Sequence, residues 1–235
     1  IKSSAASDVY KRQGHHRYET ALNYRNYCRE NGISKPGDPQ DFQMIYLVDM
    51  EHPGLVVFPT HRLVRDLPNF DKEAVLEKCS EFFYIDEKEG TDTMEEDLKK
   101  LYDEGKKAFG FYCGKGEWFL LTLKNIDIMS QMLPNVSKAS QSLDVSVLHT
   151  LILEKIFGID KENMAKQINL TYTKFFTEAI DGVDKGEFQC SFVLNPTRVT
   201  EIRDVAAAGE KMPQKSTYFY PKMITGMVMN NLGVD

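Results

Sequence analysis

Strand and helix patterns alternate in the C-terminal third of the chain, and this order constrains the fold most. Apolar runs at residues 168–172 and 188–194 predict two strands. A helical pattern lies between them at about 174–183, and another helix follows to about residue 208. Such alternation predicts a domain with layers of helices and sheet rather than an all-α or all-β domain.

The rest of the chain predicts further elements of both kinds. Helices are expected over 18–30, 71–80, 93–106 and 145–156, and strands over 42–48, 55–58, 82–85, 108–113 and 118–123. Residues 133–142 are polar and are interpreted as a linker between an N-terminal part, 14–133, and a C-terminal part, 143–235. The predicted fold class is therefore α/β (mixed α+β), with mixed sheets flanked by helices.

Composition excludes several classes of protein. A hydrophobic fraction of 42% with 27% charged residues is ordinary for a globular protein, and a net charge of −6 argues against a nucleic-acid-binding face. No apolar run is long enough to span a membrane. The four cysteines lie far apart and the histidines lack ligand spacing, so we expect reduced, mostly buried thiols, a cytoplasmic protein and no metal site of His and Cys.

A stretch near the C-terminus concentrates groups that bind anions. Residues 212–222 read Met-Pro-Gln-Lys-Ser-Thr-Tyr-Phe-Tyr-Pro-Lys, a mixture that neither a helix nor a strand requires. Two prolines bracket the segment and restrict the backbone. Between them Lys215, Ser216 and Thr217 offer an ammonium and two hydroxyls, which suit a phosphate or a carboxylate. The alternative is an ordered loop whose tyrosines pack on the core and whose lysines are solvated.

A second stretch with similar chemistry lies near the N-terminus. Gly14, His15, His16 and Arg17 lead into the helix predicted from residue 18. The free N–H groups of a helix start and the helix dipole favour an anion, and an arginine there grips phosphate through two nitrogens.

Together, and in this order, the two stretches resemble the family of unknown function numbered 1015. Its members carry a segment like Asp-Gly-His-His-Arg-Tyr and, near the C-terminus, one like Met-Pro-Lys-Ser-Thr-Tyr-Phe-Tyr-Pro-Lys. Three intermediate stretches of this chain fit as well: Pro-Thr-His-Arg at 59–62, Leu-Asp-Val-Ser-Val-Leu at 143–148 and Asn-Pro-Thr at 195–197. The resemblance covers residues 14–235. His61 and Arg62 follow a predicted strand and are secondary candidates for a site.

The Gly-His-His-Arg turn is also similar to the phosphate-gripping turn of the ParB and sulfiredoxin superfamily, which includes free-serine kinases. This resemblance implies phosphoryl transfer between a nucleotide, ATP or ADP, and serine or phosphoserine, with Mg²⁺ as a further cofactor. It implies that Gly14, His15 and Arg17 hold phosphate and that His16 donates to it or relays protons. Lys215, with Ser216, Thr217 and Lys222, would neutralise the transferred group or bind a carboxylate. The implied partner is a small phosphate-bearing substrate.

The chain departs from the family pattern at its start. Gln13 stands where the family has aspartate before the glycine, and residues 1–13 lack the expected apolar strand. We interpret residues 1–13 as a non-native or disordered segment, and the chain as a truncated, inactive part of a longer enzyme that keeps only a remnant of the ParB/sulfiredoxin-like element.

Two alternatives to an enzyme stay open. One is a nucleotide-binding switch without turnover, as in the ParB group. The other is a structural or interaction domain without a small-molecule site. A redox role like that of sulfiredoxin is weaker, because the cysteine of its turn is a histidine here.

Overall fold

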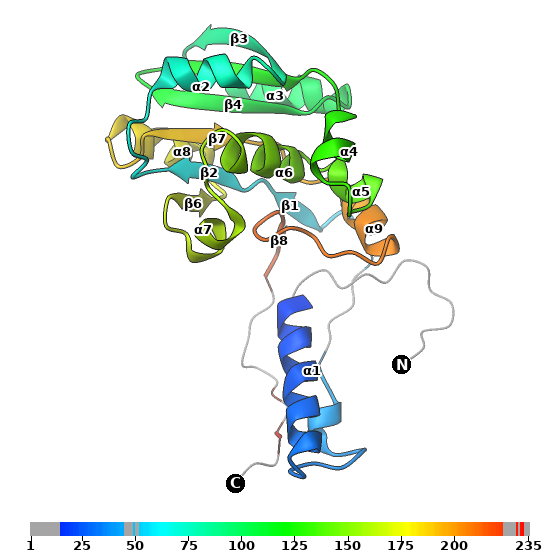
Figure 1. Cartoon of the computed structure of the whole chain (residues 1–235). Helices are drawn as coiled ribbons and strands as arrows, with labels where there is room; N and C mark the ends of the chain where they lie inside the picture. The colour runs from blue at the N-terminus through cyan, green and yellow to red at the C-terminus, as the bar shows by residue number, and fades with distance from the viewer. Residues whose placement is uncertain (1–14, 45–48, 50–51, 223–228, 230, 233–235) are drawn as a thin grey trace. The chain divides into compact units, whose positions relative to one another are not determined.

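A computed structural model of the chain describes residues 15–44, 49, 52–222, 229 and 231–232, and for residues 15–17 the backbone alone (Figure 1). The chain divides into two compact units. Unit 1 comprises residues 1–56 and 219–235, and unit 2 comprises residues 57–218. The chain leaves unit 1 within β1, Val56–Phe58, and returns within β8, Tyr218–Tyr220, and these two strands pair in a two-stranded sheet.

Unit 1 is built on the helix α1, His15–Glu30, which begins three residues before the predicted start and ends where predicted. Gly32 has the left-handed backbone (φ 69°) that suits a residue just after a helix. The loop that follows contains the short helix η1, Pro39–Asp41. It is fastened to α1 because Nη2 of Arg29 lies 2.7 Å from both carboxylate oxygens of Asp41.

Unit 2 contains a six-stranded sheet in the order β3-β5-β4-β7-β2-β6. Its strands are β2 (His61–Val64), β3 (Phe83–Glu89), β4 (Ala108–Gly114), β5 (Glu117–Leu123), β6 (Leu170–Thr173) and β7 (Cys190–Val193). In Figure 1 the sheet runs from β3 at the top of the molecule to β6 below. The mixed class with helices and sheet is confirmed.

The pairings within this sheet correct the expectation of mixed sheets. Each of its five ladders is antiparallel. The strand–helix–strand unit predicted at 168–194 is present as β6, α8 and β7. However, β2 inserts between β6 and β7 and runs antiparallel to both, so the two parallel strands are never neighbours.

Both faces of the sheet are buried. On β4, Phe109 and Phe111 join one core cluster, whereas Ala108 and Tyr112 join another. This alternation follows from the period of two residues in a strand. The nine helices of unit 2 in the described part of the chain are α2 (Lys72–Cys79), α3 (Met94–Asp103), α4 (Ile128–Met132), α5 (Lys138–Gln141), α6 (Asp144–Val147), η2 (Leu148–Glu154), α7 (Lys161–Lys166), α8 (Phe176–Asp184) and α9 (Val199–Ala207). Residues of α2, α4, α6, η2 and α7 fill the first cluster, and residues of α3 and α8 fill the second.

Most predicted elements of unit 2 are confirmed, with three differences. The strand predicted at 82–85 continues to Glu89, and the helix predicted at 145–156 is α6 followed by a π-helix, η2. Residues 61–64, which were not predicted as a strand, form β2.

The polar stretch 133–142, predicted as a linker, lies inside unit 2 and contains α5. Glu210 accepts hydrogen bonds from Ser137 N (2.6 Å) and Ser137 Oγ (2.7 Å). Gln141 is buried and donates to the carbonyls of Leu133 and Val136. These polar side chains are therefore satisfied within the fold. No helix in the described part of the chain is both long and apolar enough to cross a membrane.

A partly buried ion triad supports the same region. Lys107 Nζ lies 2.8 Å from Asp144 Oδ1 and 2.9 Å from Glu201 Oε1, and each of the three side chains is less than a fifth exposed. Burial raises the pKa of Asp144 even though Lys107 opposes the rise. The two ion pairs of the triad connect the residue before β4 with α6 and α9.

Candidate functional site

The central residue of the candidate site is Arg62, on β2. This strand lies between β6 and β7, and all four of its residues are buried. Arg62 points to the same face of the sheet as Val64, toward the cluster that η2 covers. It is 1% exposed, and burial lowers the pKa of its guanidinium to about 10. A charged side chain is rarely buried to this extent unless it is paired.

The partners of the guanidinium are neutral. Nη1 donates to the carbonyl of Thr60, and Nη2 donates to the carbonyl of Lys215 at 3.2 Å. Nη2 also lies 3.3 Å from His149 Nε2, which must accept because arginine only donates. The buried Nε has no hydrogen-bond partner, and no carboxylate of the described residues forms an ion pair with Arg62. The face of the Tyr172 ring lies 5.4 Å from the guanidinium carbon.

Two histidines flank Arg62, and both are neutral near pH 7. Burial, and then the charge of Arg62, lowers the pKa of His61 to about 4 and that of His149 well below its ordinary value. Nδ1 of His61 accepts from the backbone N–H of Leu194 at 3.2 Å. The histidines therefore add no positive charge beside Arg62. His149 lies on η2, and π-helical turns are frequent at functional sites.

A turn from the predicted stretch 212–222 covers the guanidinium. Ser216 donates to the carbonyl of Pro213 from its N–H (3.3 Å) and from its hydroxyl (2.7 Å). Thr197 Oγ1 donates to the carbonyl of Ser216 at 2.9 Å. Lys215 has a left-handed backbone (φ 55°) and an exposed side chain. A non-glycine residue seldom adopts this conformation, so the turn is strained.

The structure thus brings together several residues that the sequence analysis selected. Arg62 contacts Lys215 in unit 2, and Ser216 and Thr217 follow Lys215 in the turn. His61 points to the other face of β2, where it accepts from Leu194. Lys222 belongs to unit 1, as do residues 14–17. Gly14 lies outside the described residues, and His15, His16 and Arg17 begin α1 without described side chains. The prediction that residues 14–17 share a phosphate site with residues 212–222 therefore lies outside the described residues.

Sequence reasoning missed His149, Tyr172 and the role of Thr197. The motifs 143–148 and 195–197 had been selected, and His149 directly follows the first of them. What the sequence could not show is that β6 places Tyr172 opposite Arg62 in the sheet.

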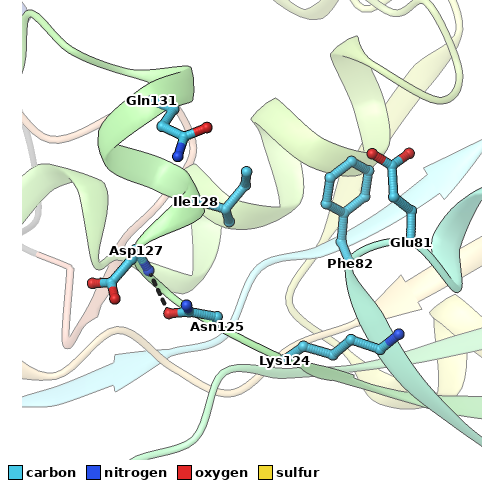
Figure 2. Close-up of a pocket in the computed structure, with 7 residues that line it drawn as sticks. All are labelled: Glu81, Phe82, Lys124, Asn125, Asp127, Ile128 and Gln131. Carbon is cyan, nitrogen blue, oxygen red and sulfur yellow. Dashed lines mark hydrogen bonds between the residues drawn. The ribbon is translucent and has the colours of Figure 1, made fainter.

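A separate hollow of about 310 Å³ lies at the edge of the sheet where β3 begins and β5 ends (Figure 2). Its lining mixes charges of both signs: Glu81, Phe82, Lys124, Asn125, Asp127, Ile128 and Gln131. Lys124 Nζ donates to the carbonyl of Ser80 at 2.7 Å, and Asn125 Oδ1 accepts from Asp127 N at 2.9 Å. None of the predicted site residues lines this hollow, and its charges do not select an anion. Among the described residues, no group of three His, Cys, Asp or Glu is placed to hold a metal ion.

Comparisons with solved structures give low similarity. A conserved hypothetical protein from Pyrococcus furiosus is 18% identical, with 88% of this chain and 68% of that chain covered and a TM-score of 0.44. Free serine kinase in complex with AMP is 16% identical, with 88% and 66% covered and a TM-score of 0.45. A mutant of free serine kinase in complex with ADP is 13% identical with the same coverage and TM-score. This chain spans about two thirds of the length of these proteins.

Sequence comparison gives a more specific result. No curated protein matches the chain. The family described as "Protein of unknown function (DUF1015)" matches residues 9–146, which include β2, Arg62 and the start of α6. The match covers more than half of the 235 residues, and it includes Arg62 but not the turn with Lys215. The chain belongs to the DUF1015 family.

Proposed function

We propose that unit 2 binds the phosphate group of a small molecule at Arg62. In the whole protein, this site would serve phosphoryl transfer between a nucleotide and serine or phosphoserine. The observation that carries the proposal is the buried guanidinium of Arg62, whose described partners are all neutral. The proposal is supported by the neighbouring turn, which contains Lys215, whose side chain is exposed, and Thr217, which is half-buried.

Taking a guanidinium out of water costs several kcal/mol unless an anion or excellent hydrogen bonds compensate it. Carbonyl oxygens compensate only in part, and Nε of Arg62 donates to nothing in the described structure. Phosphate and carboxylate match the planar fork of arginine, and hydrogen bonds to charged groups are stronger than neutral ones. An arginine kept charged without a carboxylate beside it is therefore suited to an anionic ligand.

Access to the guanidinium requires the turn to move. Nη2 of Arg62 donates to the carbonyl of Lys215, and Lys215 itself has the strained left-handed backbone. In the proposal, the anion replaces this carbonyl, and the turn relaxes so that Lys215 Nζ and the Thr217 hydroxyl approach the ligand. Ser216 contributes less, because its hydroxyl proton is already donated to Pro213. Gly14, His15, His16 and Arg17 remain proposed as phosphate-binding residues of unit 1.

Phosphoryl transfer also requires stabilisation of the negative charge of the transferred group and usually a carboxylate to orient the acceptor and hold Mg²⁺. No described carboxylate pairs with Arg62, so the described residues do not fit a Mg²⁺ ion at this point. The chemistry assigned to this chain is therefore binding and charge neutralisation of phosphate by Arg62, Lys215 and Thr217. A magnesium-dependent step is not assigned to these residues.

Binding can be measured by calorimetry, with O-phosphoserine, inorganic phosphate, ADP and ATP as ligands at constant ionic strength. We expect phosphate-bearing ligands to bind and serine to bind more weakly. Arg62→Lys keeps the charge but loses the fork, so it should cost about 1–3 kcal/mol of binding free energy. The matched control is Arg65→Lys, because Arg65 directly follows the same strand and is exposed.

Two results would overturn the proposal. One is an absence of binding of all phosphate-bearing ligands to the wild-type chain. The other is equal affinity of the wild-type, Arg62→Lys and Arg65→Lys chains for O-phosphoserine. If Arg62→Lys fails to fold, Thr197→Val is the second variant. It removes the hydrogen bond to the carbonyl of Ser216 and so disturbs the turn, but it leaves the guanidinium unchanged.

A nucleotide-binding switch without turnover is the second candidate. It is favoured by the surroundings of Arg62, where no carboxylate of the described residues forms an ion pair with the guanidinium. The two neighbouring histidines are weak bases for the hydroxyl of serine, because burial lowers their pKa values. The enzyme and the switch differ in one assay of the whole protein with ATP and serine. Formation of O-phosphoserine and ADP indicates the enzyme, whereas tight nucleotide binding without product indicates the switch.

A further inference from the structure

A second cation that forms no ion pair with a described carboxylate lies at the end of the strand that neighbours Arg62 in the sheet. Lys174 directly follows β6, and its Nζ is held against three aromatic rings, at 5.8 Å from the ring centre of Phe58, 4.8 Å from that of Phe175 and 4.6 Å from that of Tyr218. Its one hydrogen-bond partner within the described chain is the Tyr218 hydroxyl, at 3.4 Å. No described carboxylate forms an ion pair with it.

The sheet and the turn connect Lys174 with Arg62. In the β2–β6 ladder, Tyr172 is opposite Arg62, so Lys174 is two residues, or about 7 Å of strand, beyond that position. On the other side, Tyr218 comes three residues after Lys215, whose carbonyl accepts from Arg62. One short segment, 215–218, thus contacts both cations. Its Lys215 carbonyl meets the guanidinium, and its Tyr218 ring meets the ammonium.

The aromatic rings hold the ammonium in place without neutralising it. A ring attracts a cation through the negative charge of its face, but it supplies no net charge. An ammonium has three N–H donors, and here one of them has a described acceptor. Lys174 therefore keeps donors and a full positive charge for a ligand, and the ordering of its flexible side chain has already occurred.

We propose that Lys174 and Arg62 together form a clamp for a dianion, so that the site selects a phosphomonoester over a carboxylate. The inference rests on the proposed function and deepens it, since it names the ligand charge and a residue that sets it. A phosphomonoester carries nearly two negative charges near neutral pH, whereas a carboxylate carries one. Two unneutralised cations match the first and leave one charge uncompensated with the second. Phe58 and Tyr218 act as positioning residues, through Lys174.

The test compares two probes of different charge, inorganic phosphate and acetate, at pH 8 and constant ionic strength. Lys174→Met removes the charge and keeps a side chain that packs on the rings. It should weaken phosphate binding by about tenfold or more and change acetate binding by less than about threefold, since acetate needs only one cation. Lys174→Arg should restore most of the phosphate affinity, because arginine also stacks on aromatic rings. Phe58→Leu should have a smaller effect than Lys174→Met.

Lys166→Met is the matched control, since Lys166 is an exposed lysine paired with Glu162 on α7. Equal phosphate affinity in the wild-type and Lys174→Met chains, with a clear loss in Arg62→Lys, would overturn the clamp and leave the proposed function intact. An equal loss for phosphate and acetate in Lys174→Met would also overturn it, because that pattern indicates loosening of the fold. If the wild-type chain binds no phosphate, both proposals fail. Thermal unfolding of each variant without ligand reports whether it is folded.

Discussion

The guanidinium of Arg62 donates to the backbone carbonyl of Lys215 at 3.2 Å, although 153 residues separate the two in the chain. The hydrogen bond has two effects. It fixes a surface turn against β2 in unit 2, and it covers a cation that forms no ion pair with a carboxylate of the described residues. A ligand that competes for the guanidinium therefore also competes for the position of the turn.

Acid should destabilise the protein through His61. Its folded-state pKa is about 4 and lies below the ordinary value of 6.5 because the imidazole is buried and, to a smaller extent, because Arg62 is near. Between these pH values the unfolded chain binds more protons than the folded one, so stability is lost as pH falls from about 6.5 to 4. A difference of about 2.5 units corresponds to about 3 kcal/mol of unfolding free energy.

Denaturant unfolding at several pH values measures this loss. His61→Asn keeps an acceptor near the position of Nδ1 and does not titrate, so its stability should fall less steeply below pH 6.5. The control is His52→Asn, because His52 is exposed. If wild type and His61→Asn lose stability in parallel, His61 is not the group responsible.

Gly182→Ala should destabilise unit 2. A methyl group at this position would lie 2.9 Å from Cδ2 of Phe188 and 3.1 Å from Cδ2 of Leu63. Alanine favours a helix over glycine by about 1 kcal/mol, but overpacking costs about 1–3 kcal/mol, so we expect a net loss. Thr177→Ala on the exposed side of the same helix is the control and should be neutral or stabilising. A Gly182→Ala chain at least as stable as wild type would show that the Phe188 ring can move away from the added methyl group at little cost.

Lys107→Met should cost about 3–5 kcal/mol, because it leaves Asp144 and Glu201 partly buried without their cation. The loss should shrink as pH falls. Removing Lys107 raises the folded-state pKa of Asp144 further, and an acid with a raised pKa gains stability when it is protonated. Lys99→Met, in an exposed pair with Asp103, is the control and should change stability by less than about 1 kcal/mol. Equal losses in the two variants would argue against a structural role for the triad.

The thiols of unit 2 should react slowly in the folded state. Burial raises the pKa values of Cys79 and Cys113 to about 12, and that of Cys190 lies well above its ordinary value for the same reason. The thiolate is the reactive form, so a disulfide reagent at pH 8 should label these residues much faster after unfolding. Mass spectrometry of the labelled chain identifies the sites. Rapid labelling of Cys113 in the folded protein would contradict the expectation, since Cys113 is the least buried of the three.

Local patterns predicted the local elements. The two strands of the β4–β5 hairpin were predicted because apolar runs flank residues 114–117, which include Gly114 and Gly116, both with positive φ. The helix α2 was predicted at 71–80, and its N-cap Asp71 accepts hydrogen bonds from the N–H groups of Glu73 and Ala74. These signals are encoded within a few residues, so one sequence suffices to detect them.

The site itself could be predicted only in part. Arg62 and Lys215 were selected for their chemistry, but β2 was not predicted, because a buried strand that begins with histidine and arginine breaks the apolar pattern of a central strand. Such conflicts between local preference and observed structure are expected at functional sites. The position of Lys174 among three aromatic rings could not be predicted from the sequence. The rings come from positions 58, 175 and 218, which only the fold brings together.

Because β2 lies between β6 and β7, its position also determines when the hydrogen bonds of β2 can form during folding. Residues 61–64 find their neighbours only at residues 170–173 and 190–192, so more than a hundred residues must be synthesised before either edge of β2 is paired. The hairpin of β4 and β5, closed by a two-residue turn, needs no such delay. Long-range pairing is slow because the entropy of closing a long loop is lost before the contacts form. Until then, Arg62 keeps its hydration on the nascent chain, and it is desolvated in a late step of folding.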